Sequence, residues 1–153
     1  MNPDYVVSED VAQKMKEAGY PQEGCDCYWH DTLKTKDDNA INLLSKFEAG
    51  EYILSESRYV LDSGYCCNKS KGSRHTYAAP CYGRLGEELP DKIIINGMIY
   101  VLLCMKTIQN EYIIQYTCRQ INNDSHELCY TNGKKEANAR GLMWLELTRM
   151  GLI

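Results

Sequence analysis

The chain has 153 residues and a formal net charge of −4, and 44% of its residues are hydrophobic and 25% charged. These values are typical of globular proteins and exclude a disordered or collagen-like chain. No apolar run approaches the roughly 20 residues of a membrane-spanning helix, which argues against a membrane protein. The length favours a single domain, so the sequence predicts one globular domain over residues 1–153.

The sequence begins with neither the basic segment nor the apolar segment of a secretory signal. We therefore expect a cytoplasmic protein. In a reducing cytosol, cysteines are free thiols that pack like small apolar residues. The chain has eight of them, at Cys25, Cys27, Cys66, Cys67, Cys81, Cys104, Cys118 and Cys129.

The charged residues are unevenly distributed along the chain. Residues 1–62 carry 13 acidic and 6 basic side chains, whereas residues 64–153 carry 8 acidic and 11 basic ones. Neither part has the strong basic excess of a dedicated nucleic-acid-binding domain. The acidic first part could instead meet a basic partner protein.

The first predicted element is a short amphipathic helix over residues 8–18. Ser8 stands at the N-cap position before two acidic residues, and Val11 and Met15 recur on one face. Gly19 is typical of a helix end. Partial alternation of polar and apolar residues then predicts a strand over residues 25–30.

The middle of the chain, residues 31–79, is the hardest part to interpret. Residues 39–50 could form a helix, and residues 52–61 could form either a strand or a helical turn. Residues 63–77 are rich in Gly, Ser and Asn, which is typical of an exposed irregular loop. Such loops often carry binding residues, so this segment is where disorder or a partner contact is expected.

The second half has clearer patterns. Apolar residues spaced over 82–89 predict a short central helix that Pro90 ends. The Asn96-Gly97 pair between two apolar runs is a strong hairpin signal. Two further turns, near residues 106–110 and 121–125, predict strands up to Arg119 and over residues 126–130. In the simplest register of the 106–111 hairpin, Cys104 faces position 113, so that Cys104 and Cys118 are not cross-strand neighbours.

The last predicted element is a helix that opens near residues 131–133 and runs over residues 134–150. Its broad apolar content indicates that it crosses the sheet and supplies most of the core. Gly141 inside it suggests a close approach of helix and strand. The predicted fold is α+β: a three- or four-stranded antiparallel meander packed against the C-terminal helix, with short N-terminal and central helices.

Three stretches of the sequence resemble small proteins encoded by phages and integrated mobile elements of bacteria. They are VSEDVAQKMKEAGY at residues 7–20, APCYGRLGEELP at residues 79–90, and EANARGLMWL at residues 136–145. The sequence departs from the family pattern over residues 31–79, and Asn138 stands where the family has Asp. Because that family has no assigned activity, the resemblance implies provenance and layout but no chemistry.

The cysteines and histidines allow two kinds of chemical site as alternatives to simple core packing. Cys25, Cys27 and His30 could ligate zinc, and Cys66 and Cys67 could complete the site in space. A C-x-C spacing or an adjacent pair is, however, a poor chelate for one tetrahedral ion. Cys81 could be a nucleophile at a helix start with His75 as its base, although no flanking motif supports such a pair. We therefore expect no metal, no cofactor and no catalytic site.

The composition favours binding over catalysis. The chain has twelve tyrosines and one phenylalanine, and tyrosine is enriched at interface hot spots. The leading hypothesis is a non-catalytic accessory protein of a phage or mobile element that binds a host or phage protein in the cytosol. The alternative is a small nucleic-acid-associated protein, because cations and aromatics cluster within residues 69–77. The candidate partner-binding residues are Tyr65, Lys69, Lys71, Arg74, His75, Tyr77 and Tyr82.

Overall fold

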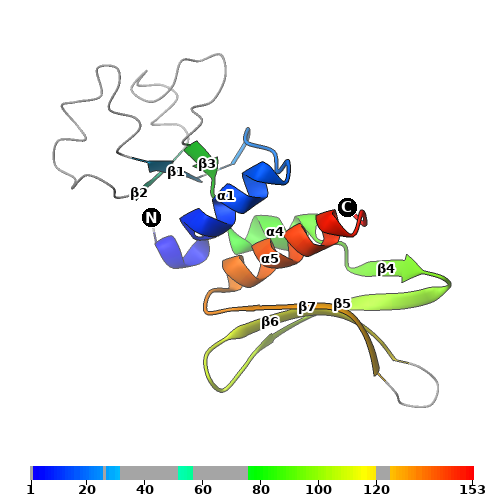
Figure 1. The fold of residues 1–153 in the computed structure, drawn as a ribbon. Helices are drawn as coiled ribbons and strands as arrows, with labels where there is room; N and C mark the ends of the chain where they lie inside the picture. Colours follow the sequence, from blue (N-terminus) through cyan, green and yellow to red (C-terminus); the bar gives the residue numbers. More distant parts are fainter. Residues whose placement is uncertain (1, 26, 32–51, 57–75, 120–124) are drawn as a thin grey trace, which may run out of the picture. The chain divides into compact units, whose positions relative to one another are not determined.

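The structure is a computed structural model that describes residues 2–25, 27–31, 52–56, 76–119 and 125–153. These residues form an α+β fold with two antiparallel sheets (Figure 1). The chain divides into two compact units, residues 1–80 and residues 81–153. The sequence-based prediction that both belong to one domain stays a prediction.

The first unit begins with the 3₁₀ turn η1 (Pro3–Tyr5) and the helix α1 (Glu9–Glu17), which confirms the predicted N-terminal helix. Ser8 occupies the N-cap position, but its hydroxyl donates to the Asp10 carboxylate and makes no cap bond to the backbone. Gly19 follows with a φ of +94°, a conformation that favours glycine at a helix end. The buried face of α1 consists of Val11, Ala12 and Met15.

The sheet of the first unit has the strand order β2-β1-β3, with both pairs antiparallel. Its strands are β1 (Cys27–Asp31), β2 (Tyr52–Glu56) and β3 (Thr76–Ala78). The Trp29 indole N–H donates to the Val7 carbonyl over 2.8 Å, which ties the central strand to the segment before α1. For residues 52–61 the sequence allowed a strand or a helical turn, and the described residues at the beginning of this segment form the strand β2.

The predicted loop over residues 63–77 was wrong at its C-terminal end, where a strand begins at Thr76. Thr76 and Tyr77 belong to β3, and the Tyr77 side chain is only 7% exposed. The Lys16 ammonium lies 5.2 Å from the centre of the Tyr77 ring, a cation–π distance. Burial of an aromatic side chain against α1 therefore outweighs the local loop signal. The remainder of that predicted loop and the predicted helix over residues 39–50 lie outside the described residues.

The second unit contains a four-stranded antiparallel meander with the strand order β4-β5-β6-β7, as predicted. Its strands are β4 (Lys92–Ile95), β5 (Met98–Lys106), β6 (Tyr112–Arg119) and β7 (Ser125–Gly133). The short helix α4 (Tyr82–Glu88) precedes β4, and α5 (Glu136–Arg149) follows β7. Figure 1 shows α5 lying across one face of this sheet.

The turns of this meander explain its register. Asn96 and Gly97 both have positive φ, +52° and +79°, which is the geometry of the predicted two-residue hairpin. The next connection spans residues 107–111, closed by the Thr107 N–H donating to the Glu111 carbonyl. It is one residue longer than the simplest hairpin, so Cys104 faces Ile114 and not position 113. Cys104 and Cys118 are not cross-strand partners in this register either, as predicted.

The core of the second unit lies between the sheet and α5. It is formed by strand residues that pack against helix residues, each at most 2% exposed: Tyr100, Ile114 and Tyr116 from the strands, and Met143 and Leu147 from the helix. The helix starts at Glu136, after β7 has continued to Gly133. The sequence-based prediction of a helix opening near residues 131–133 was therefore wrong, because these residues pair with β6.

Candidate functional site

The structure describes two of the seven sequence-predicted binding residues. Tyr77 is buried in β3, and Tyr82 is the first residue of α4, with 41% of its surface exposed. The other five, Tyr65, Lys69, Lys71, Arg74 and His75, lie outside the described residues. The buried Tyr77 ring presents little surface to a partner, whereas Tyr82 is partly exposed at the start of α4.

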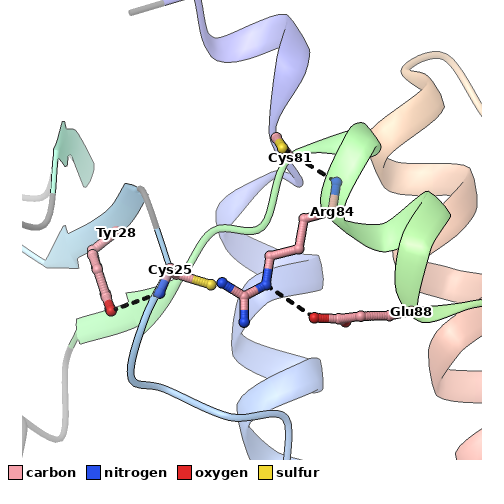
Figure 2. Close-up of polar contacts among 5 residues, drawn as sticks. All are labelled: Cys25, Tyr28, Cys81, Arg84 and Glu88. Atoms are coloured by element: carbon pink, nitrogen blue, oxygen red, sulfur yellow. Dashed lines mark hydrogen bonds and ion pairs between the residues drawn. The ribbon is translucent and has the colours of Figure 1, made fainter.

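Cys81, the candidate nucleophile, is the N-cap residue of α4. Its sulfur accepts a hydrogen bond from the Arg84 backbone N–H over 3.4 Å, and the Arg84 side chain pairs with Glu88 over 2.9 Å (Figure 2). These contacts give Cys81 a structural role in beginning the helix. His75, the base proposed with it, lies outside the described residues.

The candidate zinc ligands Cys25 and Cys27 are both buried, Cys27 as the first residue of β1 and Cys25 just before it. The Cys25 backbone N–H donates to the Tyr28 hydroxyl over 3.3 Å (Figure 2). Within the described part of the chain, no three His, Cys, Asp or Glu side chains gather where they could hold a metal ion. All six cysteines in this part are free thiols.

A histidine and a tyrosine meet on the face of the second sheet that α5 covers. His126 Nδ1 lies 3.0 Å from the Tyr100 hydroxyl, and the two rings are tilted with centroids 5.9 Å apart. Cys118 is the cross-strand partner of His126. Because the residues are widely separated in sequence, no local motif signals this contact.

Cys104 lies beside the first turn of α5. Its thiol contacts the Glu136 carboxylate over 3.8 Å, and Glu136 also pairs with Arg140 over 2.7 Å. Burial raises the pKa of the Cys104 thiol, and the negative charge of Glu136 adds to the effect against an opposing contribution from Arg140. A raised pKa keeps the sulfur protonated near neutral pH, which makes it a weak nucleophile.

The opposite face of the second sheet carries an exposed apolar surface, which we name the outer face. Side chains of a strand alternate between the two faces of a sheet, and the buried Tyr100 marks the face toward α5. The odd-numbered residues of β5 therefore point away from α5. Ile99 is 50% exposed and Val101 is 48% exposed, and their neighbour Ile94 on β4 is 62% exposed.

The strand register shows which residues lie side by side on the outer face. Leu103 pairs with Gln115, which pairs with Tyr130, and Met105 pairs with Ile113. The exposed apolar residues thus form one connected group along β5 with neighbours on the other strands. Its large exposed members are Ile94, Ile99, Val101, Leu103, Met105 and Tyr130.

Two charged residues flank this apolar group at opposite edges of the sheet. Lys92 on β4 pairs with Val101, Val101 pairs with Thr117, and Thr117 pairs with Glu127 on β7. The four residues therefore form one row across the sheet, with a cation at one end and a carboxylate at the other. Both charged side chains are exposed.

The sequence reasoning missed the outer face. The alternation along β5 was hidden because the residues between the exposed ones, such as Tyr100 and Leu102, are also apolar. A strand that is apolar on both faces reads as a fully buried strand. One signal was available in the sequence. The apolar run of β5 is long, and the single C-terminal helix can cover only one side of the sheet, so some of its apolar residues had to lie on an uncovered face.

Comparison with known proteins gives no match: no protein-family model, no curated protein and no solved structure is significantly similar to this chain. None of the helices in the described ranges is long and apolar enough to cross a membrane. The argument for a function therefore depends on the geometry of the described residues, and above all on the exposed apolar outer face.

Proposed function

We propose that this protein acts by binding another protein through the outer face of the β4-β5-β6-β7 sheet. In this proposal it is a non-catalytic accessory protein of a phage or mobile element, working in the bacterial cytosol. The sequence resemblance supports the proposed provenance. The binding mode is supported by the outer face.

The observation that carries the proposal is the connected apolar surface on β5 and its neighbours. Single exposed apolar residues are ordinary on protein surfaces, but a contiguous group with a polar rim is typical of a binding site. Ile99, Val101 and Leu103 each add about 25 cal/mol of favourable free energy for every Å² of apolar surface removed from water. A partner that covers this face therefore gains affinity from desolvation alone.

A pull-down with the full chain as bait tests the proposal. Bait protein is incubated in host lysate after nuclease treatment, and captured proteins are compared between the wild type and Val101→Glu. Val101 is at the centre of the outer face, so the charge should remove the captured partner. Ile108→Glu is the matched control, because Ile108 is fully exposed at the tip of the 107–111 connection.

Two other results would contradict this assignment. If capture is lost on nuclease treatment and falls steeply with salt, the alternative of nucleic-acid association is favoured, because phosphate contacts release counterions. If Val101→Glu and Ile108→Glu capture the same protein equally well, the partner binds elsewhere. In that case, replacement of residues 63–75 by a Gly/Ser linker examines the segment that contains most of the sequence-predicted binding residues.

A further inference from the structure

We propose that the partner of the outer face is a second copy of this chain, in a two-fold dimer whose two sheets pack face to face. This inference rests on the proposed function, since it names the protein that the outer face binds. A two-fold interface uses the same surface on both copies, so the surface must be complementary to itself. The outer face has this property.

The charges of the outer face select one arrangement of the two sheets. A two-fold axis parallel to the strands, between β5 and β6, reverses the strand order of the second copy. It places β4 over the second copy's β7 and keeps each cross-sheet row at the same level. Lys92 then lies over the second copy's Glu127, and Glu127 lies over the second copy's Lys92.

The distances suit this pairing between copies and exclude it within one chain. Lys92 and Glu127 are three strand spacings apart, about 14 Å. Packed sheets lie about 10 Å apart, a gap that an extended lysine and an extended glutamate together span. The usual rotation of about 30° between aligned sheets moves their edges by only a few Å, within reach of both side chains.

The apolar residues match in the same arrangement. The axis places β5 over the second copy's β6, so Met105 faces Ile113 and Val101 faces the methyl-bearing Thr117. A two-fold axis perpendicular to the strands would instead place β4 over β4 and β7 over β7. Each charged edge would then meet an edge of its own sign, so the parallel axis is the favoured one.

The size of the outer face sets the expected affinity. Three strands of about eight residues and the four-residue β4, at about 4.8 Å between strands and 3.4 Å between residues, give a face of roughly 450 Å² in projection. This is smaller than the roughly 800 Å² that each partner contributes to a standard stable interface. The dimer should therefore be reversible, with dissociation in the micromolar range.

Analytical ultracentrifugation of the full chain tests the dimer and its charge pairing. The wild type is measured from about 1 to about 200 μM at low salt, a range that brackets the expected dissociation constant. The charge reversals Lys92→Glu and Glu127→Lys are measured alone and as an equimolar mixture. Matched controls are Lys134→Glu and Glu87→Lys, which change the same net charges at exposed positions outside the outer face.

The two-fold arrangement makes a specific pattern of results. Each single reversal creates two like-charge contacts per dimer and should raise the dissociation constant about fivefold or more. The mixture should recover wild-type association, because a dimer of one Lys92→Glu chain and one Glu127→Lys chain restores both opposite-charge pairs. The double variant should also recover it, and the two control variants should behave like the wild type.

Two outcomes would overturn the inference. One is a wild-type chain that stays monomeric over the whole concentration range. The other is a dimer without the predicted charge pairing, seen either as equal responses to the reversals and their controls or as a mixture that associates no better than its components. If the chain is monomeric while Val101→Glu still removes a captured host or phage protein, the outer face binds that protein and only the second copy is ruled out.

Discussion

Tyr116 donates a hydrogen bond from its phenolic oxygen to the carbonyl oxygen of Pro90, 2.5 Å away. The bond joins the middle of β6 to the connection between α4 and β4, 26 residues earlier. The Tyr116 side chain is completely buried in the core between the sheet and α5. This contact anchors the start of the edge strand β4, which carries Lys92 at one end of the row across the sheet.

Replacing Tyr116 by Phe should destabilise the protein. The change removes the donor and leaves the Pro90 carbonyl without it in a part-buried site, which costs about 1–3 kcal/mol of unfolding free energy. Urea denaturation measures the loss. Tyr130→Phe is the control: the Tyr130 hydroxyl accepts an exposed hydrogen bond from Asn132, so its loss should change stability by less than about 0.5 kcal/mol. Equal effects of the two variants would contradict this role of Tyr116.

The same hydroxyl should make stability depend on alkaline pH. Burial raises the pKa of Tyr116 in the folded protein, with smaller contributions from Cys129 and Asp91, whereas in the unfolded chain it titrates near 10. Above about pH 10 the unfolded state therefore loses its proton first, and the free energy of unfolding falls by up to about 1.4 kcal/mol per pH unit. This stability is fully present at lower pH. In Tyr116→Phe this contribution to the pH dependence of the unfolding free energy should be missing. Parallel plots of unfolding free energy against pH for the variant and the wild type would show that Tyr116 is not the group responsible.

Two glycine substitutions should act in opposite directions. Gly97 has a φ of +79° in the β4-β5 turn, so Gly97→Ala should cost about 1–2 kcal/mol. Gly83 lies inside α4, and a Cβ there would meet the Cys81 sulfur at 3.8 Å, an ordinary contact. Gly83→Ala should therefore stabilise the protein by about 0.5 kcal/mol. Thermal melting of the two variants under identical conditions compares the signs, and a gain for Gly97→Ala would refute the hairpin geometry.

Local sequence signals predicted the elements whose ends are determined locally. Asn96-Gly97 specified its hairpin because only residues that tolerate positive φ fit both turn positions. Gly19 marked the end of α1 for the same reason, and Ser8 occupies the predicted N-cap position with extended backbone, although its side chain makes no cap bond. The signals failed where packing decides. Residues 131–133 look like a helix start, but pairing with β6 keeps them in β7.

The candidate site was less predictable than the fold. Tyr77 was assigned to a surface loop from the composition of its neighbours, and its burial comes from β1 and α1, which are distant in sequence. The outer face depends on which side of the sheet α5 covers, and both sides of β5 are apolar. Sequence periodicity identifies an apolar strand but does not say which face another element will cover.

Thiol labelling should follow burial and pKa. Under denaturing conditions after reduction, eight thiols should react. In the native protein, the buried Cys25, Cys27 and Cys129 should be protected, as judged by mass spectrometry of their peptides. Cys104 is more exposed, but its raised pKa should make it react slowly at pH 7 and much faster above pH 9. Rapid native labelling of Cys129 would contradict its burial, and one equivalent of zinc that survives dialysis would contradict the free-thiol interpretation.

Residues 81–153 should fold without the preceding unit. They contain a complete four-stranded sheet, the helix that covers it and a core built from both, and they form a compact unit on their own contacts. Isolated fragments of this size are marginally stable, with about 4–11 kcal/mol expected from typical values per residue. A dispersed amide NMR spectrum of the fragment and a cooperative urea transition are the expected results.

Leu147→Ala in that fragment is the internal check. The Leu147 side chain of α5 is completely buried in the core against the sheet, and its truncation should cost about 2–5 kcal/mol, a large part of the total. The variant fragment should therefore unfold at a much lower urea concentration than the wild-type fragment, while Ile153→Ala, at an exposed position, should have little effect. A wild-type fragment that is unfolded would show that the core of residues 81–153 needs residues 1–80. That result would support the sequence-based prediction of one domain over the whole chain.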